Sequence, residues 1–390
     1  MLDLRSPDFI ADPYPVFAEL RRESPMLWHE QTGMWLALSH EYANAVLRDR
    51  RLGRIWRDKE PADYFEPFNL LHRNQMMENE PPAHSRLRGL VAKAFARGHV
   101  ERLRPRVEAL ANGLLDEVGE RSEFDLLADY AEPLPVAVIA ELLGVPETDR
   151  PLLRPWSNAI VKMYEYERTP ERQGRAVTAA REFAEYMRGL ARVKRADPQD
   201  DLVSHLVQIE DGGERLSESE LVASAILLLN AGHEASVNVF GNGMVALFGH
   251  PAELERLRSD PSLLETGIEE MIRFDATLQL FERTATGDAE IGGAVIPRGE
   301  KVAALLGAAN RDPAVFTEPG RMDVGRHPNP HLGFGAGIHH CLGAPLARLE
   351  LQVSVPALLR RFPKLGLAAE PRLRPTFVLR GYQSVPVTTA

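Results

Sequence analysis

The sequence predicts a mainly α-helical protein with small β-sheets, built around one long central helix. Of its 390 residues, 44% are hydrophobic, which is enough to bury a sizeable core. No linker rich in Pro, Gly or Ser divides the chain, so we expect a single domain spanning residues 1–390. Apolar residues recur at helical spacing across residues 100–260. These observations favour one large helical domain.

Local signals near the N-terminus predict the first elements in order. A short helix should follow the Pro-containing residues 12–15. Strands at about Met26–Glu30 and Met34–Leu38 should form a hairpin around the turn at residues 31–33, and Ser39 should cap the next helix. A similar sheet is expected later, across Thr284–Val302, where Gly-rich and Pro-Arg-Gly turns separate alternating apolar positions. Helices should dominate the chain between these two regions.

The longest predicted helix begins with the capping box Ser217-Glu218-Ser219-Glu220 and continues to about Gly249, before Pro251. Its length would be about 48 Å. After the first turn, Glu234 is its only charged residue, so the helix should be buried on nearly every side. A membrane span is the alternative, but polar side chains occupy its middle and second half, where lipid makes them costly. We therefore expect no membrane insertion.

Charge and the N-terminal segment limit the possible partners and location. The net charge of −10 argues against nucleic acid and anionic membranes as partners. The charged N-terminus lacks the apolar stretch of a signal peptide, so we expect a cytoplasmic protein. One segment differs, because residues 84–106 hold seven Arg or Lys residues and a single acid, Glu101. This segment is either a solvated helix face or a docking surface.

Cys341 is the only cysteine, and it lies in a glycine-rich turn, residues 334–343, that leads into an apolar helix. Glycines allow positive φ and let a flat cofactor approach the backbone. A helix N-terminus stabilises a thiolate through its dipole. These features predict a metal ligand. The alternatives are a buried apolar cysteine and a zinc site with His339 and His340, which would need a fourth ligand.

The turn reads F-G-A-G-I-H-H-C-L-G and fits the haem-binding signature F-G-x-G-x-H-x-C-x-G of the cytochrome P450 family, which the chain resembles. The resemblance implies haem b with Cys341 as the iron ligand. It also implies cationic partners for the haem propionates. Arg86, which lies between two of these cationic residues in the sequence, should point away from the propionates. The residues assigned to the cofactor in this way are Cys341, His84, Arg88, Arg283, His339, Phe334 and Gly335.

A second family motif, E-x-x-R, matches Glu270 and Arg273. Alone it is weak, because acid and base at this spacing are common on helix surfaces. Its weight comes from the residues that follow in the family's order, residues 310–313, Arg326 and His331. The resemblance implies that Arg326 joins Glu270 and Arg273 in a buried network that holds the cysteine loop.

The long helix contains A-G-H-E-A-S at residues 231–236, where the family has A-G-x-(D/E)-T-(T/S) beside the oxygen-binding side of the haem. The resemblance gives Gly232 the role of leaving room for dioxygen and Glu234 that of the acid in a proton relay. The threonine hydroxyl of that relay is missing, because Ala235 stands in its place. Ser236 lies about 100° further around the helix and does not obviously replace it. These four residues are the predicted catalytic set.

Three explanations for Ala235 stay open. A hydroxyl on the substrate supplies the missing group, or the relay runs through Ser236 or His233 after local distortion of the helix. In the third, the enzyme uses peroxide or performs oxidative coupling, which needs little proton delivery. For Glu234 itself, a purely structural role as a buried acid bonded to the backbone is the alternative.

The resemblance implies a soluble haem-thiolate monooxygenase that inserts one oxygen atom from O2 into a small apolar substrate. Electrons would come from a separate ferredoxin and its reductase, with residues 84–106 as part of the docking surface, and the protein would be a monomer. Residues 53–80 would form a lid over the pocket, with Leu278, Leu280 and Phe281 on the opposite wall, suited to a polyketide, terpenoid or steroid. A haem-based sensor and a haem-free binding scaffold are the non-enzymatic alternatives.

Overall fold

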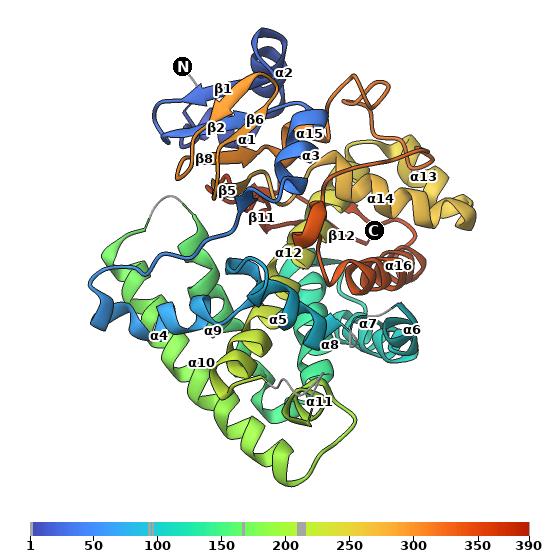
Figure 1. Ribbon diagram of the computed structural model, residues 1–390. Coiled ribbons are helices and arrows are strands. Elements are labelled where there is room, and N and C mark those ends of the chain that lie inside the picture. The colour runs from blue at the N-terminus through green and yellow to red at the C-terminus, as the bar shows by residue number, and fades with distance from the viewer. Residues whose placement is uncertain (1–2, 93–94, 96, 166–167, 209–215, 390) are drawn as a thin grey trace. The chain divides into compact units, whose positions relative to one another are not determined.

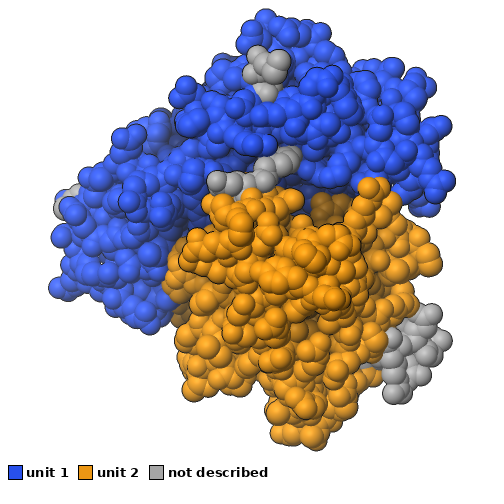
Figure 2. Space-filling view, turned by 90° about the vertical axis from the view of Figure 1, so that its left-hand side faces the viewer, with its two compact units in different colours: residues 1–53, 111–131, 235–390 blue, residues 54–110, 132–234 orange. Residues whose placement is uncertain are grey.

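The computed structural model describes residues 3–92, 95, 97–165, 168–208 and 216–389, and Figure 1 shows its elements. The chain is mainly helical with small sheets, as predicted. It divides into two compact units, drawn in blue and orange in Figure 2. Unit 1 comprises residues 1–53, 111–131 and 235–390, and unit 2 comprises residues 54–110 and 132–234. The single domain over residues 1–390 remains a prediction.

Unit 1 contains the strands of the described residues. They are β1 (Met26–His29), β2 (Met34–Ala37), β3 (Leu52–Gly53), β4 (Glu123–Asp125), β5 (Phe281–Ala285), β6 (Ala289–Ile291), β7 (Ala294–Ile296), β8 (Lys301–Ala304), β9 (Gly366–Leu367), β10 (Arg372–Leu373), β11 (Tyr382–Ser384) and β12 (Pro386–Thr388). Its helical elements are α1 (Pro7–Ala11), α2 (Tyr14–Glu23), α3 (His40–Arg48), η3 (Leu127–Ala131), α13 (Pro251–Ser259), η6 (Pro261–Leu263), α14 (Leu264–Phe274), α15 (Leu306–Ala309), η7 (Gly337–His339) and α16 (Ala344–Arg361).

The main sheet of unit 1 has the strand order β1-β2-β8-β5-β3. The predicted hairpin is confirmed, with Met26 opposite Ala37, and Gly33 takes a φ of 61° in its turn. Strand β2 pairs in parallel with β8 from the later sheet region. The predicted cap is confirmed, because Ser39 Oγ accepts from the backbone N–H of Tyr42 at 3.2 Å. Helix α3 then packs on β8.

The smaller sheets of unit 1 show where helical spacing was an incomplete guide. Strand β4 lies inside the region with helical apolar spacing, yet it pairs with β12, which also pairs with β9. Three residues are too few to show a period, and their partners come from the other end of the chain. The remaining pairs are β6 with β7 and β10 with β11.

The N-terminal segment of unit 1 is tied to residues far along the chain. Arg380 donates hydrogen bonds to the carbonyls of Ile10 and Ala11, and its Nε donates to Asp275 Oδ1 at 2.7 Å. The hydroxyl of Tyr14 donates to the same carboxylate oxygen at 2.6 Å. One guanidinium therefore joins the first helix to the segment before β11.

Unit 2 is helical in its described residues. Its elements are α4 (Ala62–Arg73), η1 (Met76–Glu78), α5 (Ala83–Ala92), α6 (Arg97–Arg102), the first part of α7 (Arg104–Val118), α8 (Pro133–Leu143), η4 (Glu147–Asp149), α9 (Arg150–Val161), η5 (Lys162–Tyr164), α10 (Pro170–Ala196) and α11 (Leu202–Gln208). Helix α10 packs along α9, α4 and α11, and in Figure 1 it is the long green helix.

The predicted long helix is α12 (Glu218–Phe248), whose first part belongs to unit 2 and whose part from Ala235 onward belongs to unit 1. Its capping box is confirmed. The Ser217 N–H donates to Glu220 Oε2 at 2.9 Å, and the Glu220 N–H donates to Ser217 Oγ at 3.2 Å. Most of its side chains are buried. Among the described helices, none has the length and apolar character needed to cross a membrane.

Candidate functional site

The cysteine loop presents Cys341 at the start of α16. The backbone N–H of Cys341 donates to the carbonyl of Phe334 at 2.9 Å, which closes the loop. The cysteine is exposed although the chain around it is partly buried. Helix α16 begins three residues later, after the N-cap Gly343. The sulfur therefore lies near a helix N-terminus, where the dipole stabilises a thiolate.

Two glycines give this loop its shape. Gly335 and Gly337 have φ values of 68° and 70°, in the left-handed region that side chains disfavour. A Cβ on Gly337 would also lie 2.4 Å from the carbonyl oxygen of Leu47 in α3. The glycines predicted from the motif are thus required by backbone angle and, at position 337, by close packing.

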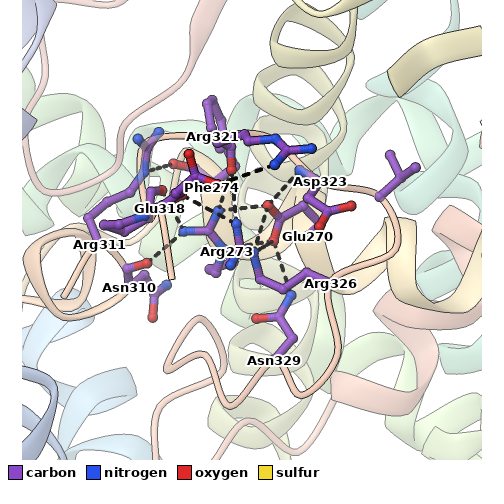
Figure 3. Close-up of polar contacts among 12 residues, drawn as sticks. Glu270, Arg273, Phe274, Asn310, Arg311, Glu318, Arg321, Asp323, Arg326 and Asn329 are labelled. Carbon is purple, nitrogen blue, oxygen red and sulfur yellow. Dashed lines mark hydrogen bonds and ion pairs between the residues drawn. The ribbon is translucent and has the colours of Figure 1, made fainter. Parts of the chain in front are cut away.

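The predicted E-x-x-R network is present in unit 1, and Figure 3 shows its contacts. Glu270 and Arg273 are both 0% exposed, and two hydrogen bonds of 2.7 Å join them. Arg326 Nε lies 3.1 and 3.2 Å from the two oxygens of Glu270, as predicted. Asn329 Nδ2 and the Asp323 N–H also donate to this carboxylate. Arg273 further donates to the carbonyl of Asn310 at 2.9 Å, and to those of Pro319 and Arg321, so the network fixes the segment before the cysteine loop.

The four predicted catalytic residues are neighbours on α12, where His233 separates Gly232 from Glu234, Ala235 and Ser236. Gly232 and Glu234 fall in unit 2, and Ala235 and Ser236 fall in unit 1. All four are half-buried. The methyl group of Ala235 offers no hydrogen bond. The hydroxyl of Ser236 is hydrogen-bonded to the carboxyl of Glu350 in α16, within unit 1.

Glu350 is a further candidate site residue, which was not predicted from the sequence. It is 6% exposed, and burial raises its pKa to about 8, although the hydrogen bond from Ser236 lowers it somewhat. The carboxyl therefore keeps its proton at pH 7. Its sequence signal is weak, since it is one acid among the apolar residues of α16. Nothing in the sequence shows that Ser236 is its neighbour.

The predicted propionate partners occupy three elements. His84 and Arg88 lie four residues apart on α5 in unit 2, where His84 is buried and Arg88 half-buried. In unit 1, Arg283 on β5 is 2% exposed, its guanidinium lies 4.4 Å from the centre of the Phe281 ring, and His339 ends η7. Their roles toward a cofactor remain predictions. Arg86 pairs with Glu220 of α12, in agreement with its expected different direction.

Of the predicted lid, residues 53–80, all but Gly53 belong to unit 2, where they have a core of their own. The His72 ring stacks on Trp56 and Phe68, with ring centres 4.4 and 4.1 Å away. Lys59 Nζ lies 5.7 Å from the centre of the Trp56 ring, and the Tyr164 hydroxyl lies 3.4 Å from His72 Nε2. Burial lowers the pKa of His72 to about 4, so the stacked ring is neutral at pH 7. Stacked aromatic rings thus pack this segment together.

Ion pairs reduce the positive charge of residues 84–106. Besides Arg86, Arg104 pairs with Glu101 and Arg106 pairs with Glu141. Arg102 is exposed, and Lys93 lies outside the described residues. The segment therefore presents a weaker positive surface than the sequence count suggested.

The cysteine loop fits a thiolate-ligated haem. Its sulfur is exposed beside a helix N-terminus, and Gly335 and Gly337 within the loop have the positive φ that its sharp turns require. Within the described parts of the chain, no three His, Cys, Asp or Glu side chains gather as a metal-binding group, so His339, His340 and Cys341 do not form one. The haem-thiolate interpretation agrees with this geometry better than a zinc site does.

Comparisons with known proteins identify the family. The family model for cytochrome P450 matches residues 154–365. The cytochrome P450 monooxygenase PikC of Streptomyces venezuelae is 41% identical, over 97% of this chain and 92% of its own. The 6-deoxyerythronolide B hydroxylase of Saccharopolyspora erythraea is 40% identical, over 99% and 98%. The structure of PksS, a cytochrome P450 of the Bacillus subtilis bacillaene polyketide synthase, has a TM-score of 0.92 at 36% identity and full coverage of both chains. The chain therefore belongs to the cytochrome P450 family of oxidoreductases, whose members carry a haem-thiolate cofactor.

Proposed function

We propose that this protein is a monooxygenase that inserts one oxygen atom from O2 into an apolar substrate carrying a hydroxyl near the reacting carbon. The cofactor would be haem b, held through its iron by the thiolate of Cys341. When bound, it supplies dioxygen activation, and the thiolate favours O–O cleavage. Support for a polyketide-like substrate comes from PksS, which is named for a polyketide synthase, and support for hydroxylation comes from a second relative that is named a hydroxylase.

The observation that carries this proposal is the pairing of Ser236 with Glu350 next to Ala235. Position 235 has no hydroxyl, and the hydroxyl of Ser236 is bonded to a carboxyl in another helix of the same unit. The chain thus holds a proton at Glu350 and a hydrogen-bonding oxygen at Ser236, but it presents a methyl group where the family's threonine would stand. A substrate hydroxyl would complete the missing position.

Electrons would come one at a time from a ferredoxin and its reductase. Residues 84–106 support this, although ion pairs neutralise part of their charge. The exposed Arg102 is the best test position. An Arg102→Glu variant should accept electrons more slowly from an acidic ferredoxin, and the difference should shrink at high salt. An equal rate at low salt would place the donor elsewhere.

A spin-shift screen of the ferric holoprotein tests the substrate proposal. It uses matched pairs of apolar compounds, each with and without a hydroxyl near the reactive carbon. We expect the hydroxyl-bearing member of a pair to displace the iron-bound water and to convert reducing equivalents into product efficiently. Equal behaviour of both members would contradict substrate assistance and would favour a relay through Ser236 or His233, or a peroxide route.

Two variants refine the test. Ala235→Thr should raise product yield per electron for the compounds that lack the hydroxyl, because the chain then provides the group itself. Ser236→Ala is the companion variant, because it removes the neighbouring hydroxyl, leaves position 235 unchanged and so tests a relay through Ser236 separately. Unaltered coupling in Ala235→Thr across several compounds would show that position 235 does not limit the reaction.

A further inference from the structure

Beside the Glu270 network, a second carboxylate joins three segments of unit 1. Glu269 in α14 accepts two hydrogen bonds from Arg348 in α16, from Nε to Oε1 at 2.6 Å and from Nη2 to Oε2 at 2.8 Å. His331 Nε2 lies 2.9 Å from Glu269 Oε2. Such a bidentate contact fixes both the position and the orientation of a guanidinium. Arg348 is thus held in one place although about a third of its side chain is exposed.

The held guanidinium lies against the cysteine loop. Its centre is 4.5 Å from the centre of the Phe334 ring, a cation–π contact. The carbonyl of Phe334 accepts the hydrogen bond from the Cys341 N–H. A chain of contacts therefore connects the Glu269 carboxylate to Cys341 through the Arg348 guanidinium and Phe334.

Arg348 and Glu269 form an ion pair beside the cysteine loop. The hydrogen bonds to Glu269 raise the pKa of Arg348 against the effect of burial, and its Coulombic interaction with Cys341 raises it further. Burial alone would raise the pKa of Glu269, but Arg348 and His331 lower it to about 2. Both Glu269 and Arg348 are therefore charged at neutral pH.

We propose that Arg348 and Glu269 are positioning residues that set the reduction potential of the cofactor bound to Cys341. This inference rests on the proposed role of Cys341 as the thiolate ligand. A fixed positive charge near the thiolate stabilises the form with one more electron and raises the potential, and the carboxylate opposes it. The stacking on Phe334 keeps the guanidinium at a constant distance, so the potential is defined by geometry rather than by a mobile surface charge.

The test is the midpoint potential of the purified holoprotein, measured by spectroelectrochemical titration. Arg348→Gln should lower the potential, and Glu269→Gln should raise it. Arg348→Lys, which keeps the charge but loses the planar contact, should lie between the wild type and Arg348→Gln. Arg361→Gln, an exposed cation at the other end of α16, should leave the potential unchanged.

Opposite shifts separate this role from a structural one, because loss of either partner would weaken the loop in the same way. Shifts in the same direction, or unchanged potentials in both variants, would overturn the proposal. So would a slower electron transfer from the donor at an unchanged potential, which would make Arg348 a docking residue. The red-shifted carbonyl band of thiolate haem, recorded on the same wild-type sample, checks the ligand separately. Its absence would overturn the role of Cys341 itself.

Discussion

Glu270 in α14 and Glu350 in α16 are both buried acids of unit 1, but they differ in the donors around them. Glu270 faces the guanidinium groups of Arg273 and Arg326, with an amide and a backbone N–H in addition. For Glu350, the partner found among the described residues is the hydroxyl of Ser236. Burial alone thus does not decide the role of an acid. Cations make Glu270 part of the scaffold, whereas a single hydroxyl leaves Glu350 holding a proton.

The largest effect should come from breaking the Glu270 cluster. Arg273→Ala removes one of its two guanidinium partners and leaves buried charge uncompensated, which should cost about 3–5 kcal/mol of unfolding free energy. Denaturant unfolding measures this loss. Arg321→Ala is the matched control, because Arg321 forms an exposed pair with Glu318 that is worth at most about 1 kcal/mol. Equal losses in the two variants would contradict a special role for the cluster.

Glu350 should reveal itself in the pH dependence of stability. Its pKa is about 8 in the folded protein, against an ordinary value of 4.5, so the folded state binds more protons between these values. The contribution of Glu350 to the free energy of unfolding is fully present below about pH 4.5. It is lost as the pH rises to about 8, by at most about 1.4 kcal/mol per pH unit. Glu350→Gln should remove this contribution. Parallel pH profiles for the two proteins would show that the acid is not protonated.

The smallest effect should come from Ser236→Ala. Loss of one hydrogen bond should cost about 1 kcal/mol. Because that bond lowers the pKa of Glu350, its loss should move the titration of the carboxyl to higher pH. Difference infrared spectra against Glu350→Gln follow this titration. A shift to lower pH would mean that Ser236 instead stabilises the protonated acid.

The sequence predicted those parts of the molecule in which the signal is local. The capping box at Ser217, the cap at Ser39 and the glycines of the cysteine loop each depend on residues close in the chain, and all three are confirmed. The Glu270 network was also predicted, but through the family motif rather than through spacing. The 100° turn from Ala235 to Ser236 indicated that the hydroxyl points elsewhere.

Contacts between distant segments were missed. Nothing near Glu350 indicates Ser236, and nothing near Arg348 indicates Glu269, since each pair joins different helices. The basic segment was overestimated for the same reason, because Glu141 and Glu220, which neutralise Arg106 and Arg86, lie outside it. Charge counted along a chain does not include partners that folding brings in.

The tie between Arg380 and the carbonyls of Ile10 and Ala11 has a consequence for synthesis on the ribosome. The partner of those carbonyls, Arg380, is synthesised long after them. The same holds for strand β2, whose partner β8 is also synthesised much later. Unit 2 is complete once residue 234 has been made. We expect it to fold first, because contacts across long sequence separations form slowly and chains fold from the N-terminal side as they are made. Capture of the cofactor by Cys341 would then be one of the last events in the maturation of this protein.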